Sequence, residues 1–281
     1  MSDLKFDHAG LGRWTGESRF EVTRERIAEY ARATNDPIEE HLAGDIAPPV
    51  FAIVPVFDSL LEPAVETMPV ELIPRVVHGE QDFVFHRPIR PGDKLVSRAK
   101  MIGWEGLPNG TRSATYIECR TEAGDLVNEQ YVTTFVRKFD VGETVGELSP
   151  GHKFDETLRT DAPVAKIVQH VDDDQTFRYS PAAGDPMPIH LDAEIARSTG
   201  LPGIIAHGLC TLAFTSWAVL TEVADSRTER LKRLAVRFSK PVLPGQDIST
   251  RIWRASAGTY AYETSVGDAV VVKDGLAVIA A

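Results

Sequence analysis

Polar and apolar residues alternate in short runs over the last 50 residues, and a long apolar stretch precedes these runs. The runs RLAVRFSKPV, DISTRIWRA, TYAYETSV and AVVVKDGLAVIA are separated by glycine or proline turns, which is typical of short antiparallel strands. The stretch at 207–223, HGLCTLAFTSWAVLTEV, is apolar nearly all round, as expected of a helix that is buried on most sides. This order predicts an antiparallel sheet wrapped around one long central helix.

The chain nearly repeats itself. YARATNDPIEEH at 30–41 aligns with YSPAAGDPMPIH at 179–190, and FHRPIRPGDKL at 85–95 aligns with FSKPVLPGQDI at 238–248. The two offsets, 149 and 153 residues, are almost equal. Two matches in the same order indicate a tandem duplication of one structural unit.

The duplication predicts an α+β chain of two similar domains, each an antiparallel sheet around a long helix. We expect the N-terminal domain over residues 1–142 and the C-terminal domain over residues 153–281. The junction is predicted in FDVGETVGELSPGHKF, 139–154, because this segment is rich in glycine and polar residues.

Composition narrows the range of functions. The net charge of -11 over 281 residues argues against broad nucleic-acid binding, which requires a basic face. Cys119 and Cys210 are too far apart for a disulfide framework or a metal-binding motif, so neither a metal nor another cofactor is expected. The first residues lack an apolar signal core, and no apolar run reaches the roughly 20 residues that span a bilayer. A cytoplasmic protein without a membrane span is therefore expected.

The segment AAGDPMPIHLD brings together groups suited to acid–base chemistry. Asp185 and His190 stand five residues apart on a turn stiffened by Pro186 and Pro188. An imidazole can take and return a proton near neutral pH, and a carboxylate can orient it, so the two can hold one water molecule. The Gly208 N–H, at the start of the buried helix, is a free donor at the positive end of the helix dipole.

These residues also carry a family resemblance. AGDPMPIHLD followed by GLPGIIAHGLCTLAF resembles the hydratase 2 motif of the MaoC-like hot-dog family, the (R)-specific enoyl thioester hydratases and dehydratases. The first half, with YARATNDP, APPVFA and HGEQDFVFHRPIRPGD, resembles the partner subunit of two-subunit mycobacterial-type (3R)-hydroxyacyl thioester dehydratases. The residues that match the hydratase motif are Gly184, Asp185, Pro188, Ile189, His190, Asp192, Ile205, His207 and Gly208.

The resemblance implies a double hot-dog fold and the reversible hydration of trans-2-enoyl thioesters to (3R)-hydroxyacyl thioesters. The substrate would be linked to CoA or to an acyl carrier protein. The implied catalytic residues are Asp185, His190 and Gly208, with Ser216 at the family position eight residues beyond the glycine. His207 is expected to orient the turn.

Two departures from the family pattern keep other functions open. Met187 stands where the family usually has Asn, and Ala183 stands where it has Ser. The alternatives are a hot-dog acyl thioesterase and a non-catalytic protein that binds acyl thioesters.

The first half repeats the acid–base pair as Asp36 and His41, but APPVFA has no His-Gly at the matching helix start. We therefore expect the N-terminal domain to hold substrate rather than to catalyse. Pro55 is expected to kink the helix there and open an apolar tunnel. The oligomeric state does not follow from the sequence, and a homodimer is kept as one option.

Overall fold

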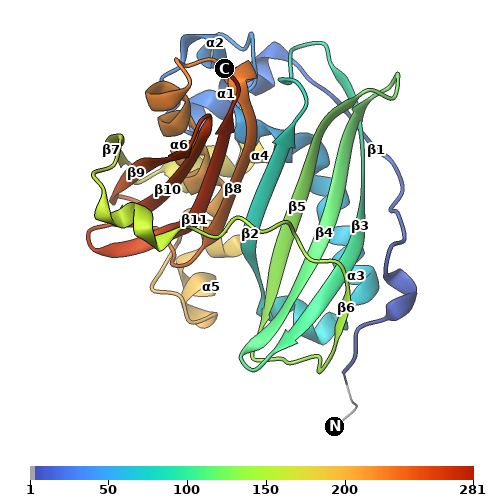
Figure 1. Cartoon of the computed structure of the whole chain (residues 1–281). Coiled ribbons are helices and arrows are strands. Elements are labelled where there is room, and N and C mark those ends of the chain that lie inside the picture. The colour runs from blue at the N-terminus through green and yellow to red at the C-terminus, as the bar shows by residue number, and fades with distance from the viewer. Residues whose placement is uncertain (1–3) are drawn as a thin grey trace. The chain divides into compact units, whose positions relative to one another are not determined.

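The computed structural model describes residues 4–281 and has the predicted α+β architecture. Its contacts form two compact units, which Figure 1 shows as ribbons. Unit 1 comprises the residues up to Phe20 together with 55–84 and 94–151. Unit 2 comprises 21–54, 85–93 and 152–281.

The compact units differ from the halves predicted from the sequence. Residues 21–54 and 85–93 belong to the first half by sequence similarity, but their contacts place them with the second half. The boundaries of the duplicated domains, 1–142 and 153–281, therefore stay a prediction about sequence repetition.

Unit 2 contains the predicted meander and its central helix. Helix α6 (Gly208–Val223) covers one face of the sheet and contacts its strands, as Figure 1 shows. Eleven of its residues are buried, which confirms the helix that the apolar stretch predicted. The sheet runs in the order β8 (Leu231–Phe238), β11 (Ala269–Ile279), β10 (Thr259–Val266), β9 (Asp247–Ser256) and β7 (Ala165–His170).

Buried hydrogen bonds as well as apolar contacts hold α6 on the sheet. Gln169 on β7 donates its side-chain amide to the Phe214 carbonyl of α6 at 2.6 Å. The Thr264 hydroxyl on β10 lies 3.1 Å from the Thr215 hydroxyl of α6 and 2.8 Å from the Thr250 hydroxyl on β9. Because every one of these groups is buried, its hydrogen bond avoids a desolvation cost and fixes where α6 lies along the strands.

The shorter helices of unit 2 carry the turns of interest. Asp192 caps α5 by accepting from the N–H groups of Glu194 and Ile195, and Gly200 follows the helix at a φ of +85°. The helices besides α6 are α1 (Arg24–Ala33), α2 (Glu39–Leu42), α4 (Gln175–Ala183) and α5 (Ala193–Ser198), with 3-10 turns η2 (Pro49–Val56), η4 (Glu156–Thr160), η5 (Pro188–His190) and η6 (Thr228–Arg230).

Helices α1 and α4 come from matched positions of the duplication, and they pair with each other. The hydroxyls of Tyr30 and Tyr179, 149 residues apart, lie 3.3 Å from each other, and both residues are buried. On either side, the Arg26 guanidinium donates to the Ala182 carbonyl, and the Gln175 amide donates to the carbonyl of Ala33. The same offset relates Arg26 to Gln175 and Ala33 to Ala182, so the two repeats meet in a nearly twofold-symmetric contact.

Unit 1 repeats the arrangement of a helix against a meander. Helix α3 (Phe57–Thr67) packs on β3 and β4, and a core cluster that includes Leu72, Met101 and Trp104 lies beside it. The sheet runs in the order β1 (Ser18–Glu21), β3 (Lys94–Leu107), β4 (Gly110–Thr121), β5 (Leu126–Arg137) and β2 (Val76–Phe85), and the short strand β6 (Thr144–Gly146) pairs with β3. Two 3-10 turns, η1 (His8–Gly10) and η3 (Val70–Arg75), lie outside the sheet.

The expected kink at Pro55 does not occur in a continuous α-helix. Pro55 lies in the 3-10 segment η2, and α3 begins two residues later at Phe57. Proline lacks the N–H of a helix interior and is tolerated near a helix start, so the change from 3-10 to α geometry accommodates it. Between residues 4 and 281, we find no helix with both the length and the apolarity needed to cross a membrane.

The tyrosine pair gives a test of the contact between the repeats. Tyr30→Phe and Tyr179→Phe should each lower the free energy of unfolding by about 1 kcal/mol, because each leaves one buried hydroxyl without its partner. The double variant should lose less than the sum of the two, as urea unfolding would measure. Tyr260→Phe serves as the control, since its hydroxyl contacts Arg254 instead. Additive losses for the tyrosine pair would contradict a direct interaction.

Candidate active site

The turn between α4 and η5 positions Asp185. Gly184 ends α4 with a φ of +76°, a conformation that glycine adopts without steric cost. The Ser180 hydroxyl then holds the Asp185 carbonyl at 2.7 Å. One Asp185 carboxylate oxygen, Oδ1, accepts the Met187 N–H at 3.1 Å, and the other has no hydrogen-bond partner among the residues described. The turn therefore fixes a carboxylate with one oxygen available.

His190 is held by a backbone carbonyl. It is buried at the end of η5, and its Nδ1 lies 2.8 Å from the Ile205 carbonyl oxygen. A carbonyl only accepts, so Nδ1 carries the proton, and Nε2 is left as an acceptor. That assignment makes His190 a base with its lone pair available.

His207 supports both groups. Its ring stacks on the His190 ring, with centroids 3.8 Å apart, and its Nε2–H donates to the Asp185 carbonyl at 3.2 Å. The Tyr179 ring also packs on His207, with the two ring centroids 4.8 Å apart. These contacts agree with the expectation that His207 orients the turn.

Burial shifts the protonation of all three groups toward their neutral forms. Loss of solvent raises the pKa of Asp185 and lowers the pKa of His190. It lowers the pKa of His207 to about 3, and the neighbouring His190 adds to that shift. At neutral pH both imidazoles are therefore uncharged, and Asp185 is a stronger proton acceptor than an exposed carboxylate.

Gly208 is the first residue of α6, so its N–H has no acceptor within the helix. The Phe238 ring passes close to this position, and a Cβ at residue 208 would lie 3.3 Å from the Phe238 ring. Glycine thus keeps the backbone donor uncovered beside a tightly packed ring.

Ser216 lies farther along the same helix. Eight residues of α-helix separate it from Gly208, a rise of about 12 Å. Its hydroxyl is buried and has no hydrogen-bond partner among the described residues. Because of this separation, the two donors cannot share one oxygen atom, and the role of Ser216 stays a prediction.

The departure at Met187 leaves the turn intact. The Met187 side chain is 49% exposed, while its backbone N–H and carbonyl bind Asp185 and His190. The hydrogen bonds that hold the turn therefore come from the backbone of residue 187. An Asn side chain is not needed to form it.

The same residues could hold a metal ion by geometry. In the part of the chain that the structure describes, Asp185, His190 and His207 offer ligand atoms that all lie within 4.8 Å of one another. Both histidines use one nitrogen in a bond to a backbone carbonyl, and the opposite nitrogen is unprotonated. A carboxylate and two neutral imidazoles are suitable ligands for zinc, so the expected absence of a metal needs an experiment.

The repeated pair in the first half has a different geometry. Asp36 accepts directly from His41 Nδ1 at 2.7 Å, and His41 Nε2 lies 2.6 Å from the Thr228 hydroxyl. Both ring nitrogens are thus occupied. Pro48 and Pro49 stand where the second half has His-Gly, and a proline has no N–H to donate.

Two contributors to these sites, Thr228 and the Ile205 carbonyl, had no signal in the sequence. Thr228 lies in an ordinary polar segment, DSRTER, and reaches His41 only through the fold. The Ile205 carbonyl is a backbone group whose role depends on conformation. Tyr30 did have a signal, because its spacing from Asp36 matches that of Tyr179 from Asp185.

Comparisons with known proteins identify relatives of both halves of the chain. Residues 154–275 match the MaoC like domain, and residues 9–130 match the FAS1-like, dehydratase domain region. A probable enoyl-CoA hydratase 2 from Dictyostelium discoideum is 29% identical over 209 residues, 73% of this chain and 70% of that protein. The 3-hydroxyacyl-thioester dehydratase Y from Mycobacterium tuberculosis is 29% identical over 211 residues, 71% of each chain.

A solved structure shows the same fold. The MaoC-like dehydratase from Phytophthora capsici has a TM-score of 0.86 at 23% identity and covers 95% of each chain. The family matches cover both halves, and the fold agrees over nearly the whole length. Residues 154–275 therefore form a MaoC-like domain, residues 9–130 match a dehydratase domain region, and the chain has the double hot-dog fold.

Proposed function

We propose that this chain catalyses the reversible hydration of trans-2-enoyl thioesters to (3R)-hydroxyacyl thioesters. The observation that carries the proposal is the pair of unoccupied acceptors, Asp185 Oδ2 and His190 Nε2, on one rigid turn. The enoyl-CoA hydratase 2 and the hydroxyacyl-thioester dehydratase among the relatives perform reactions of this class by name.

The two acceptors can share one water molecule. A carboxylate oxygen of Asp185 and a ring nitrogen of His190 lie within 4.8 Å of each other. A water with two hydrogen bonds of about 2.8 Å fits that separation. Such a water donates both protons to the enzyme and keeps a lone pair free to attack.

The reaction then moves one proton through the pair. The water oxygen bonds to C3 of the enoyl group while His190 Nε2 takes one of its protons, and the new hydroxyl keeps the other. Negative charge develops on the thioester oxygen, where the Gly208 N–H can stabilise it, a contribution of about 3 to 4 kcal/mol for a well-placed donor. The Asp185–His190 pair then returns a proton to C2. Dehydration follows the same steps in reverse.

The alternatives have less support. A thioesterase must direct water at the thioester carbonyl carbon, and nothing in this arrangement favours that atom over C3. A non-catalytic binding protein was suggested by Met187, but the turn forms without an Asn side chain.

Substrate carrier and setting belong to the same proposal. In this proposal the thioester is linked to CoA or to an acyl carrier protein, and the first half helps to hold it. The proposed compartment is the cytoplasm. A homodimer is one option for the oligomeric state.

Asp185→Asn and His190→Ala should each lower the rate of crotonyl-CoA hydration at least about a hundredfold, because each removes a positioned proton-transfer group. Loss of the conjugated enoyl absorbance measures the rate. The double variant should be little worse than the poorer single one, since both groups act on one water. Release of free thiol instead of hydration would favour the thioesterase, and no reaction at all would favour the binding protein.

Asp185→Asn should also raise Tm at pH 7. Burial raises the pKa of Asp185, so the stability that its protonated form contributes is present at acid pH and is lost as pH rises through that pKa. The ionised carboxylate therefore destabilises the fold at neutral pH, and an amide removes this cost. The gain should shrink as pH falls through the raised pKa of folded Asp185 and should be gone below its unfolded-state pKa. A lower Tm at pH 7 would contradict the account.

The pH dependence of kcat/KM for hydration should reflect the buried histidine. Burial lowers the pKa of His190, so its unprotonated form persists below pH 6.5. The rate should stay level from pH 8 to about pH 6.5 and fall only at lower pH. An acid limb centred at or above pH 6.5 would mean that another group limits the reaction.

Treatment with a metal chelator should leave hydration unchanged, because Asp185, His190 and Gly208 supply the base, the acid and the oxyanion donor. The control is chelation followed by dialysis and addition of zinc. Activity that disappears on chelation and returns with zinc would assign the three-residue group of Asp185, His190 and His207 to a metal.

A further inference from the structure

A groove lies on the sheet of unit 2, on the face opposite α6. On β9, Thr250 points toward α6, because its hydroxyl lies 2.8 Å from that of Thr264, which contacts Thr215 of the helix. Neighbouring residues of a strand point to opposite faces, so Ser249 and Arg251 lie on the outer face. The groove there has a volume of about 460 Å³, within the range of about 300 to 1,000 Å³ for small-molecule sites.

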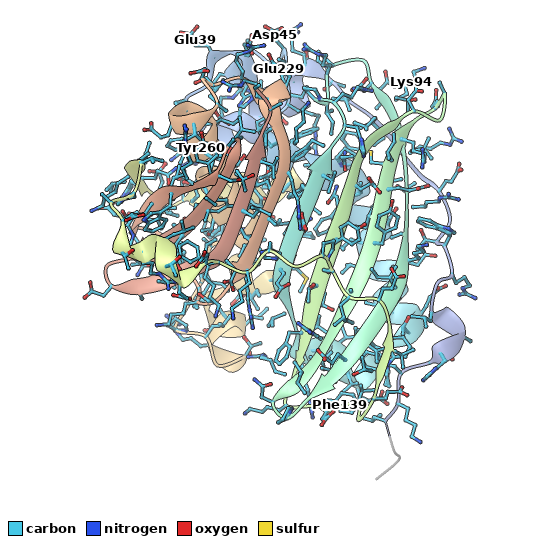
Figure 2. All side chains as sticks on the ribbon, in the orientation of Figure 1. Glu39, Asp45, Lys94, Phe139, Glu229 and Tyr260 are labelled. Carbon is cyan, nitrogen blue, oxygen red and sulfur yellow. The ribbon has the colours of Figure 1, made fainter. Side chains whose placement is uncertain are left out.

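Three adjacent strands, β7, β9 and β10, form the base of the groove. Lys166 on β7 lies opposite Arg251 on β9, and Ser249 on β9 lies opposite Ser265 on β10. Tyr260, which Figure 2 labels, lies near the other end of β10 from Ser265. All of the lining residues belong to unit 2, and none of the four residues with predicted catalytic roles is among them.

Two cationic side chains at one end of the groove have unused hydrogen-bond donors. Both oxygens of Glu263 accept from Arg159, whereas Arg251 Nη2 is 3.9 Å from Glu263 Oε2, at the outer limit for an ion pair. Lys166 is exposed and forms no salt bridge with another residue of the described range 4–281. The guanidinium of Arg251 and the ammonium group of Lys166 are therefore available to a phosphate, which accepts charge-assisted hydrogen bonds from both.

The middle of the groove contains two serine hydroxyls. The Ser249 oxygen is buried and has no hydrogen-bond partner among the described residues. A buried hydroxyl without a partner costs stability, and a polar ligand atom next to it removes that cost. Ser265 is only 7% exposed and lies opposite Ser249. These groups favour a polar ligand over an acyl chain.

Acidic side chains lie at the other end of the groove. Asp247 precedes Arg251 on β9 by a distance of about 13 Å along the strand, and Asp268 lies in the turn between β10 and β11. One Asp247 oxygen, Oδ1, accepts from His170 Nδ1 at 2.7 Å, and Asp268 is exposed. Carboxylates bind hydroxyl and amino groups and repel anions, so an inorganic anion matches only one end of the groove.

We propose that this groove binds a nucleoside phosphate. The phosphate lies on Lys166 and Arg251, and hydroxyl or amino groups of the sugar or base lie on Asp247 and Asp268. Such a ligand has an anionic end and a donor end, as the groove requires, and its size fits the volume of the groove. The same chemistry has two sources, a free nucleotide and the nucleotide end of CoA, and the second source rests on the proposed function.

Adenosine monophosphate (AMP) is the probe, and isothermal titration calorimetry on the full chain measures its Kd. AMP should bind saturably, and adenosine and inorganic phosphate should each bind at least about tenfold more weakly, because each matches one end alone.

Single variants test the two ends of the groove. Lys166→Met keeps most of the side chain but removes the charge, so it should weaken AMP binding at least about fivefold. Asp268→Ala removes an acceptor at the opposite end and should weaken binding of AMP but not of inorganic phosphate. Lys153→Met is the control, because Lys153 is exposed and does not line the groove.

Kinetics separates the two sources of the ligand. If the nucleotide end of CoA occupies the groove, Lys166→Met should raise KM for crotonyl-CoA at least about fivefold. KM for crotonyl-N-acetylcysteamine, which has no nucleotide, should not change. If a free nucleotide occupies the groove, both KM values should stay at the wild-type level while AMP binding is weakened.

The proposal is overturned if AMP does not bind saturably, if Lys166→Met binds AMP like the wild type, or if inorganic phosphate binds as tightly as AMP. The last result would mean a simple anion site. Because calorimetry needs no hydration activity, these outcomes are distinct from a failure of the proposed function.

Discussion

The contact between α1 and α4 through the hydroxyls of Tyr30 and Tyr179 is the constraint on which both Asp-Pro-x-x-x-His turns of unit 2 depend. Each Asp-Pro-x-x-x-His turn follows directly from one of these helices, so their pairing sets where each turn begins. The Tyr179 ring also packs on His207, and His207 stacks on His190. A buried chain of rings therefore connects the contact between the repeats to the base of the proposed reaction. Displacement of Tyr179 would disturb the packing of the His190 imidazole.

The two turns show how one sequence spacing leads to two hydrogen-bond arrangements. On one turn a backbone carbonyl orients His190, and the carboxylate of Asp185 remains available to share a water with it. On the other turn the carboxylate of Asp36 itself orients His41, and a hydroxyl occupies the remaining nitrogen. The difference lies in what binds Nδ1. On the turn of the first half both Asp36 oxygens already accept hydrogen bonds, from Ile38 N–H and from His41, whereas Asp185 keeps one oxygen without a partner among the described residues.

Burial gives the proposed active site its reactivity at a cost in stability. Loss of solvent makes Asp185 a better proton acceptor and keeps His190 uncharged, and the same loss of solvent makes the ionised carboxylate unfavourable in the folded chain. Ser216 and His207 add buried polar atoms without partners among the described residues. Such groups cost stability and persist where the surrounding structure holds them. In unit 2 the buried hydrogen bonds between α6 and the sheet provide that support.

The sequence by itself determined the features that depend on neighbouring residues. Periodicity predicted helix α6 and the strands of the second meander, the duplication predicted a similar sheet in the first half, and the Gly184 to His190 turn was recognised from its own residues. Tertiary structure alone decided that residues 21–54 pack with the second half, that the Ile205 carbonyl orients His190, and that Thr228 completes the pair of Asp36 and His41. Local sequence patterns predict the backbone conformation and the burial of residues that are close together along the chain. Contacts between residues that belong to different elements form only when helices, strands and turns pack, and no short stretch of sequence encodes them.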